Sequence, residues 1–99
     1  MQKQELYQAV MAKVADITDL PTGIILNSIT ERGTDARFLL VRALYKLGFT
    51  DTEMAERIGR SRQAVAHLRT GYKRTGKWLL ENQWQTLVKW MEHEYFQSK

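Results

Sequence analysis

Residues 50–74 read TDTEMAERIGRSRQAVAHLRTGYKR, and this stretch decides how the chain folds. Thr50 and Glu53 have the spacing of a capping box, in which each side chain accepts a hydrogen bond from a backbone N–H that the start of a helix leaves free. We therefore predict a short helix over residues 51–58.

A short turn separates this helix from a second one. Gly59 and Arg60 form the turn, and Ser61 is a good N-cap because its hydroxyl can accept from a free N–H of the following residues. The same hydroxyl and the free N–H groups could also hold a phosphate. We predict the second helix over residues 62–72.

Two helices joined by so short a turn must cross closely, so the first helix needs a small side chain, and Ala55 is that residue. Gly59 follows four residues later, where we expect a positive φ. Val65 and Leu68 follow the glycine by six and nine residues, where the second helix must bury its inner face. This combination predicts a helix-turn-helix. Arg60 departs from the pattern, since a buried aliphatic residue is common there.

The second helix has an apolar side and a polar side when it is read at about 100° per residue. Val65, Leu68 and Tyr72 cluster on the apolar side. The polar side has two adjacent stripes without an acidic residue, made of Arg62, Ala66, Arg69 and Lys73 and of Gln63, His67, Thr70 and Arg74.

This polar side carries groups that can recognise DNA. Arg62 and Gln63, in the first turn, can pair bidentately with guanine and adenine edges in the major groove. Arg69, Lys73 and Arg74 lie further along, where contacts to phosphates are expected. A scaffold with a merely solvated basic surface would have the same pattern, so that alternative stays open.

Positive charge is concentrated in the same part of the chain. Residues 57–77 contain no Asp or Glu and seven basic residues, namely Arg57, Arg60, Arg62, Arg69, Lys73, Arg74 and Lys77. The other eight basic residues and all eleven acidic residues lie elsewhere, although the whole chain carries only +4. Such a segment favours an anionic polymer or surface through counterion release and long-range attraction.

Helical periodicity extends over most of the remaining sequence. Apolar residues at three- and four-residue steps predict a first helix over residues 3–16, and Pro21 prevents its continuation. A short helix around Ile24 and Ile25 follows. We expect it to end near Gly33, where the glycine can supply a positive φ.

A third helix is expected over residues 36–47, with Thr34 or Asp35 as its N-cap and Gly48 as its C-terminal cap residue. No segment shows the strict alternation of apolar and polar residues that is typical of a half-buried strand. The 99 residues therefore predict one all-α domain, a compact bundle of about five to six helices.

Residues 76–96 predict a long amphipathic helix that packs back on the first helix. Its apolar stripe consists of Leu80, Trp84, Leu87, Met91 and Tyr95. Trp78, Trp90 and Phe96 lie partly off this stripe. They could form a surface for a homodimer or another protein partner, or they could cover a second packing face.

Composition argues against several classes of protein. The chain has no cysteine, and its two histidines, His67 and His93, lack neighbours with ligand spacing, so no metal or cofactor is expected. No catalytic arrangement stands out, and we expect neither an enzyme nor a small-molecule substrate. The N-terminus lacks the plan of a signal peptide, and no apolar run approaches the roughly 20 residues that cross a bilayer. We therefore expect a cytoplasmic location.

Several stretches follow one another in a characteristic order over residues 6–74. After the first helix come IILNS (24–28), Ala36-Arg37 at the opening of a long helix, TEMAERIGR (52–60) and SRQAVAHL (61–68). In this order the chain resembles the C-terminal DNA-binding domain of the bacterial replication initiator DnaA, which has a Trp-repressor-like fold. The last stretch is similar to that family's DHTTVLHA signature, with Val65 and His67 at its valine and second histidine.

The resemblance implies roles for particular residues. Arg62 and Gln63 fall where the family's first histidine and first threonine read bases. Arg37 falls on an arginine that opens the long helix and approaches the DNA backbone or minor groove. His67 would support the recognition helix near the phosphates.

The chain departs from the family at three points. The family's Asp-His-Thr-Thr is Ser61-Arg62-Gln63-Ala64 here, so the initiator's target sequence does not carry over. The loop before the long helix, which is basic in the family, contains Glu31 and Asp35 here. A glycine-rich phosphate loop of the kind that hydrolyses nucleotides is absent from the sequence.

These observations favour sequence-specific binding of double-stranded DNA in a regulatory or initiator-like role, which would place the protein at the bacterial nucleoid. The residues that we expect at the DNA are Arg37, Arg60, Ser61, Arg62, Gln63, Ala66, His67, Arg69, Thr70, Lys73 and Arg74. The alternative is a protein-interaction module that uses Trp78, Trp90 and Phe96 on a helix-turn-helix scaffold. Added salt separates the two, because it weakens DNA binding steeply and aromatic docking hardly at all.

Overall fold

The computed structural model of the chain describes residues 2–73 and 76–96. Over these residues it contains six helices and no strand, which confirms the prediction of an all-α fold. The helices are α1 (Lys3–Thr18), α2 (Thr22–Asn27), α3 (Glu31–Lys46), α4 (Asp51–Ile58), α5 (Arg62–Thr70) and α6 (Trp78–Tyr95).

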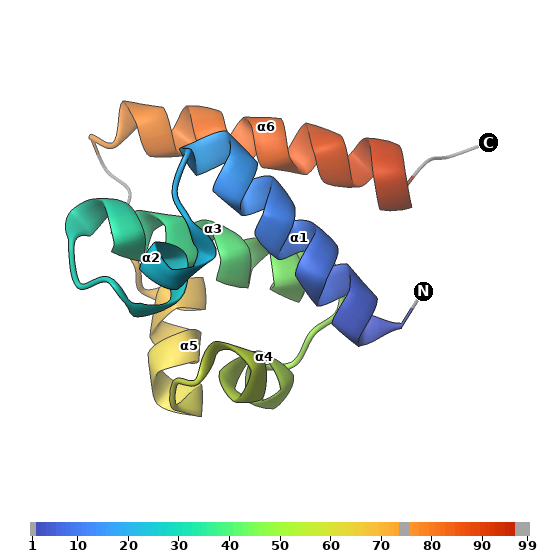
Figure 1. Cartoon of the computed structure of the whole chain (residues 1–99), viewed down its shortest axis with the longest axis horizontal. Coiled ribbons are helices and arrows are strands. Elements are labelled where there is room, and N and C mark those ends of the chain that lie inside the picture. Colours follow the sequence, from blue (N-terminus) through green and yellow to red (C-terminus); the bar gives the residue numbers. More distant parts are fainter. Residues whose placement is uncertain (1, 74–75, 97–99) are drawn as a thin grey trace.

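Helix α3 is the centre of the arrangement, and each of the other five described helices contacts it. Helix α6 runs along the top of the view in Figure 1, with α1 packed against it and α3. Helices α4 and α5 lie on the opposite side, at the bottom of the same view. The predicted helix-turn-helix segment therefore lies on the side of the molecule away from α6.

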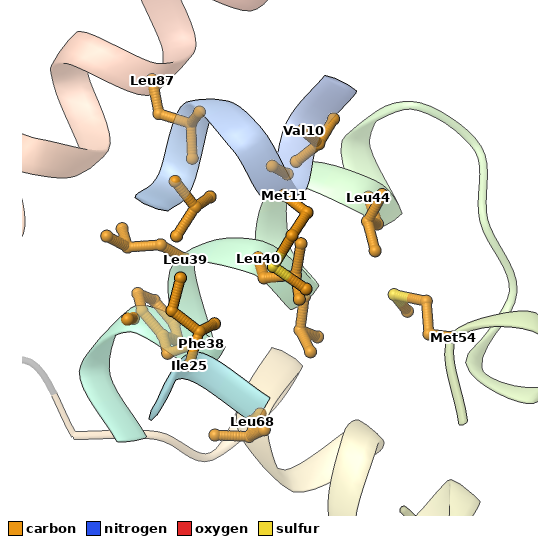
Figure 2. Packing of buried hydrophobic residues seen from close by; sticks show 14 of the residues in the cluster. Val10, Met11, Ile25, Phe38, Leu39, Leu40, Leu44, Met54, Leu68 and Leu87 are labelled. Atoms are coloured by element: carbon orange, nitrogen blue, oxygen red, sulfur yellow. The ribbon is translucent and has the colours of Figure 1, made fainter. Parts of the chain in front are cut away.

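One hydrophobic core receives side chains from all six helices (Figure 2). Representative buried residues, one from each helix in chain order, are Val10, Ile25, Leu40, Met54, Leu68 and Leu87. Burying an aliphatic side chain of this size stabilises the folded state by about 1.5–3 kcal/mol relative to leaving it exposed. The core therefore fixes where α4 and α5 lie.

The start of α3 differs from the prediction. The helix begins at Glu31 rather than Ala36, and its N-cap is Thr30, whose hydroxyl accepts from the Gly33 N–H at 3.2 Å. Gly33 is therefore inside the helix and does not have a positive φ. A glycine occupies this helical position because the start of α3 packs closely on the preceding loop: a Cβ on Gly33 would lie 2.5 Å from the Cβ of Ser28.

The C-terminal ends of α1 and α5 also differ slightly from the prediction. Helix α1 continues two residues further than expected, to Thr18, and Asp19 then adopts a left-handed conformation with φ 56°. Helix α5 ends at Thr70 instead of Tyr72. The ring of Tyr72 stacks on Phe38 of α3, with 5.1 Å between ring centroids.

The amphipathic character predicted for the last helix is confirmed. Leu80, Trp84, Leu87 and Met91 of α6 are buried, and Tyr95 is half-buried. Helix α6 packs against α1, as expected, and also against α3. Neither α6 nor another helix in the described part of the chain has the length and apolar character needed to cross a membrane.

Candidate nucleic-acid interface

The capping box at the start of α4 forms as predicted. The Thr50 hydroxyl accepts from the Glu53 N–H at 3.1 Å, and the Thr50 N–H donates to the Glu53 carboxylate at 2.9 Å. Lys3 of α1 donates to the same carboxylate at 2.6 Å. Because of these contacts, and of the Lys3 ammonium above all, the pKa of Glu53 is lowered to about 2. The N-terminus of α4 is thus tied to α1.

The turn between α4 and α5 also has the predicted geometry. Gly59 has φ 77°, a left-handed conformation that glycine adopts without steric cost. The N–H groups of Gly59 and Arg60 donate to the carbonyl of Ala55 at 2.9 and 3.2 Å. The Ser61 hydroxyl accepts from the Ala64 N–H at 3.1 Å and caps α5. These bonds fix the direction in which α5 leaves the turn.

The inner face of α5 is buried as expected, at Val65 and Leu68. The exposed residues on its outer side and just beyond its end are Arg62, Gln63, His67, Thr70 and Lys73. Ala66 is half-buried between them. The structure therefore brings most of the predicted contact residues together along one side of one helix.

The first turn of α5 borders an open hollow of about 270 Å³. Its lining consists of Arg62, Gln63 and Ala66 from α5 and of Asp51 and Thr52 from α4. The positive charge of Arg62 is near enough to contribute to the lowered pKa of Asp51. The two α5 side chains with planar donor groups, Arg62 and Gln63, thus lie next to each other at a solvent-open position.

Arg69 has a different setting from the one expected for a phosphate contact. Its guanidinium forms two hydrogen bonds of 2.9 Å with the carboxylate of Asp51 and lies 4.5 Å from the ring centroid of Tyr45. The Arg69 bonds are the largest cause of the lowered pKa of Asp51. The sequence already indicated that Arg69 lies near the buried side of α5, since it follows Val65 by one helical turn and lies only about 40° from it around the helix.

Arg60 is also held within the protein. Its guanidinium donates to the carbonyl of Leu26 at 2.9 Å, so it ties the turn to the end of α2. This contact explains how an arginine can occupy a position where a buried aliphatic residue is common: the half-buried side chain satisfies a carbonyl that the C-terminus of a helix leaves free.

Arg37 requires a correction. The resemblance implied an approach to DNA, but the residue is only 4% exposed. Its guanidinium donates to the carbonyls of Ile25 and Ser28 at 3.0 and 2.6 Å. Burial is the main cause that lowers the pKa of Arg37. The charge at this position joins α3 to the end of α2 and does not reach the surface.

The remaining predicted residues have smaller polar roles in the fold. The Thr70 hydroxyl donates to the carbonyl of Ala66 at 2.8 Å, and the Ser61 hydroxyl is engaged in its cap. The imidazole of His67 covers Gly71, where an added Cβ would lie 3.0 Å from Nδ1. Arg74 lies outside the described residues.

Two cations of α3, Arg42 and Lys46, were not among the residues predicted from the sequence. Arg42 donates to the carbonyl of Arg69 at 3.4 Å, and both cations line an open groove beside the end of α5. Residues four apart in a helix share a face, and this face lies off the stripe of buried α3 residues. The four-residue spacing of Arg42 and Lys46 could therefore have predicted that the two cations share one partly exposed face of α3.

The three aromatic residues of the C-terminal segment do not gather in one patch. Trp78 is 76% exposed and opens α6, whereas Phe96 is 46% exposed and follows the end of this 18-residue helix. At about 1.5 Å per residue the two lie about 27 Å apart. Trp90 is half-buried and packs edge-on against Tyr95, with 5.6 Å between centroids.

Among residues 2–73 and 76–96, no three side chains of the types that bind metals come together. Comparisons of the chain with protein-family models, with curated proteins and with solved structures found no match.

Proposed function

We propose that this protein binds double-stranded DNA, with the first turn of α5 in the major groove. The observation that carries the proposal is the placement of Arg62 and Gln63. Both are exposed at the start of a helix whose exit from the turn is fixed by Gly59 and the Ser61 cap. A base-reading side chain needs this combination of free donors and a rigid backbone.

The dimensions and chemistry of α5 suit this role. The helix has nine residues, so it is about 13 Å long and can enter a major groove about 12 Å wide with its N-terminal end. The guanidinium of Arg62 can pair with O6 and N7 of guanine, and the amide of Gln63 can pair with N6 and N7 of adenine. Lys73 is exposed beyond the end of α5, and we assign it a contact to a phosphate.

Asp51 limits the positive charge of this surface. Its carboxylate binds Arg69 and lies close to Arg62, so it neutralises part of the charge that the sequence placed on α5. A negative group at the edge of the interface penalises close approach of phosphates that are not correctly positioned. We infer that the binding therefore depends more on base contacts than the sequence charge suggests.

The order of the helices supports the proposal that this protein is similar in fold to the DnaA C-terminal domain and to other Trp-repressor-like DNA-binding domains. A long central helix is followed by a capped short helix, a glycine turn and a second helix, as the resemblance implies. The biological role that follows is regulation or initiation at the bacterial nucleoid. Arg37 is excluded from the proposed contact set, because it is buried and bound to two carbonyls.

The test is selection of bound sequences from a randomised duplex pool, followed by anisotropy with the enriched duplex at low and near-physiological salt. Gln63→Ala should lower the preference for the enriched sequence by about 1–3 kcal/mol. Lys73→Ala should weaken binding to all duplexes and reduce the salt slope by about 1. Lys89→Ala is the matched control, since Lys89 is exposed on α6, away from α5.

Two results would contradict the proposal. One is that the wild-type protein fails to bind any duplex at low salt. The other is that Gln63→Ala and Lys73→Ala cause equal losses on every duplex. The first result would favour the rival function, protein interaction, for which the adjacent exposed residues Trp78 and Leu79 at the start of α6 are the supporting observation.

A further inference from the structure

A groove that is both basic and aromatic lies between α3, α5 and α6. It has a volume of about 510 Å³ and is open to solvent. Its lining residues are Arg42, Tyr45, Lys46, Arg69, Thr70 and Trp84. None of these lining residues is acidic. Because Arg69 is neutralised by Asp51, the uncompensated charge of the groove comes from Arg42 and Lys46.

Aromatic rings hold these two cations in place. The Arg42 guanidinium lies 5.3 Å from the ring centroid of Trp84 and 5.9 Å from that of Phe38. The Lys46 ammonium lies 5.5 Å from the ring centroid of Phe96. Cation–π contacts of this kind order long side chains without using their N–H donors. Less conformational entropy is then lost when an anion binds.

Most donors of the two cations are not engaged by the described part of the protein. A guanidinium has five N–H donors, and within the described residues Arg42 uses one of them, in its bond to the Arg69 carbonyl. Lys46 has three donors and forms no such bond within residues 2–73 and 76–96. Donors on a partly covered, acid-free surface match a phosphate, which offers several acceptor oxygens.

The distance from this protein groove to the first turn of α5, which carries Arg62 and Gln63, matches the dimensions of DNA. Thr70 borders the groove, and Gln63 lies seven residues earlier on the same helix, so the two are about 10 Å apart along the axis. This separation is close to the width of the major groove, about 12 Å. When the first turn of α5 faces base edges, the end of α5 therefore lies at the edge of the DNA major groove, where the phosphates are.

We propose that Arg42 and Lys46 bind a backbone phosphate of the same duplex that α5 reads. This inference rests on the proposed function, and it adds a contact outside the helix pair α4–α5. This contact would fix the angle at which α5 enters the DNA major groove, because Arg42 and Lys46 belong to α3, the central helix of the bundle. Tyr45, which is 50% exposed, forms the outer wall of the site.

The test uses the full chain with Lys46→Gln, and Lys89→Gln as the control for the loss of one positive charge. Thermal unfolding of both variants is measured first to confirm that they are folded. Lys46→Gln should weaken binding of the enriched duplex about three- to tenfold at about 50 mM salt and reduce the salt slope by about 0.9. Lys89→Gln should leave both quantities at their wild-type values.

A second measurement locates the contact on the DNA. Duplexes are prepared in which one backbone phosphate at a time is replaced by a neutral methylphosphonate. At one position the replacement should weaken wild-type binding by the same factor as Lys46→Gln. That replacement should have no effect on the Lys46→Gln protein, because the contact has already been removed. Arg42→Lys, which keeps the charge but loses the planar donors, should weaken binding by a smaller factor.

The outcomes separate the two proposals. If Lys46→Gln and Lys89→Gln both bind like the wild type while Gln63→Ala still loses base preference, the groove site is wrong and the proposed function stands. Equal losses in Lys46→Gln and Lys89→Gln would also overturn the site, because they would reflect net charge alone. If the wild-type protein binds no duplex, both proposals fail.

Discussion

Replacing Gly33 by alanine tests the close approach between the start of α3 and the loop before it. The added Cβ would lie 2.5 Å from the Cβ of Ser28, 2.8 Å from its Oγ and 3.1 Å from the carbonyl oxygen of Ile24. Side-chain Cβ atoms do not tolerate the first of these distances, so Ser28 must move. The result depends on how firmly Ser28 is held.

Four hydrogen bonds hold Ser28 in place: its N–H donates to the carbonyl of Ile24 at 3.0 Å, and the other three involve its hydroxyl and its carbonyl. Its hydroxyl pairs with the Thr30 hydroxyl at 2.7 Å and accepts from the Thr30 N–H at 3.1 Å, and its carbonyl accepts from Arg37 at 2.6 Å. Two neutral bonds contribute about 1 kcal/mol each, and a bond to a charged donor about 1.5–3 kcal/mol. Alanine returns up to about 1 kcal/mol through its higher helix propensity. If the bonds of the Ser28 hydroxyl and carbonyl are lost, Gly33→Ala should therefore lower the free energy of unfolding by about 2.5–4 kcal/mol.

Urea unfolding, followed by circular dichroism and tryptophan fluorescence, measures this loss at constant m value. Gly23→Ala in α2 is the control, because a Cβ there would have no neighbouring atom within 4 Å. It should stabilise the protein by about 0.5–1 kcal/mol. The reasoning is refuted if Gly33→Ala is neutral or stabilising, or if adding Ser28→Gly to Gly33→Ala restores none of the lost stability.

The other predictions concern charged residues. Arg37→Met should destabilise the fold by about 2–3 kcal/mol in urea, because it leaves one buried and one partly buried carbonyl without donors, yet it should not change duplex affinity. Glu53 has its pKa lowered from 4.5 to about 2 by Lys3, so its stabilising effect is complete above pH 4.5 and disappears as the pH falls toward 2. Thermal unfolding of Glu53→Gln should lack this pH dependence. Asp51→Asn releases Arg69, so anisotropy should show tighter DNA binding with a salt slope steeper by about 0.9.

The helix pair α4–α5 could be predicted from sequence because its signals are local. Thr50 and Glu53 bond to each other's backbone within four residues, Gly59 needs only its own φ, and Ser61 caps the helix that it precedes. Such interactions depend little on the rest of the fold. The predicted bounds of α4 and the start of α5 therefore agree with the structure.

The start of α3 could not be placed in the same way. Thr30, Thr34 and Asp35 are all acceptable N-caps, and local chemistry does not choose between them. The choice is made by the packing of Gly33 on Ser28, a contact between two elements. The partners of Arg37 and Arg69 could not be predicted for the same reason, since they lie at the end of α2 and on α4, although the spacing of Arg69 from Val65 already placed Arg69 near the buried side of α5. A basic residue in a list of charges does not reveal which carbonyl or carboxylate it will meet.

The central position of α3 has a consequence for how the protein opens. Every other described helix contacts α3, so separating one helix from the bundle uncovers part of the surface that supports the rest. Backbone amides in the middle of α3 should therefore exchange with solvent only when the whole molecule unfolds, whereas those at the helix ends exchange by local fraying. The chain then behaves as one cooperative unit, and α5, the helix that we propose reads a duplex, keeps its position for as long as the core remains closed.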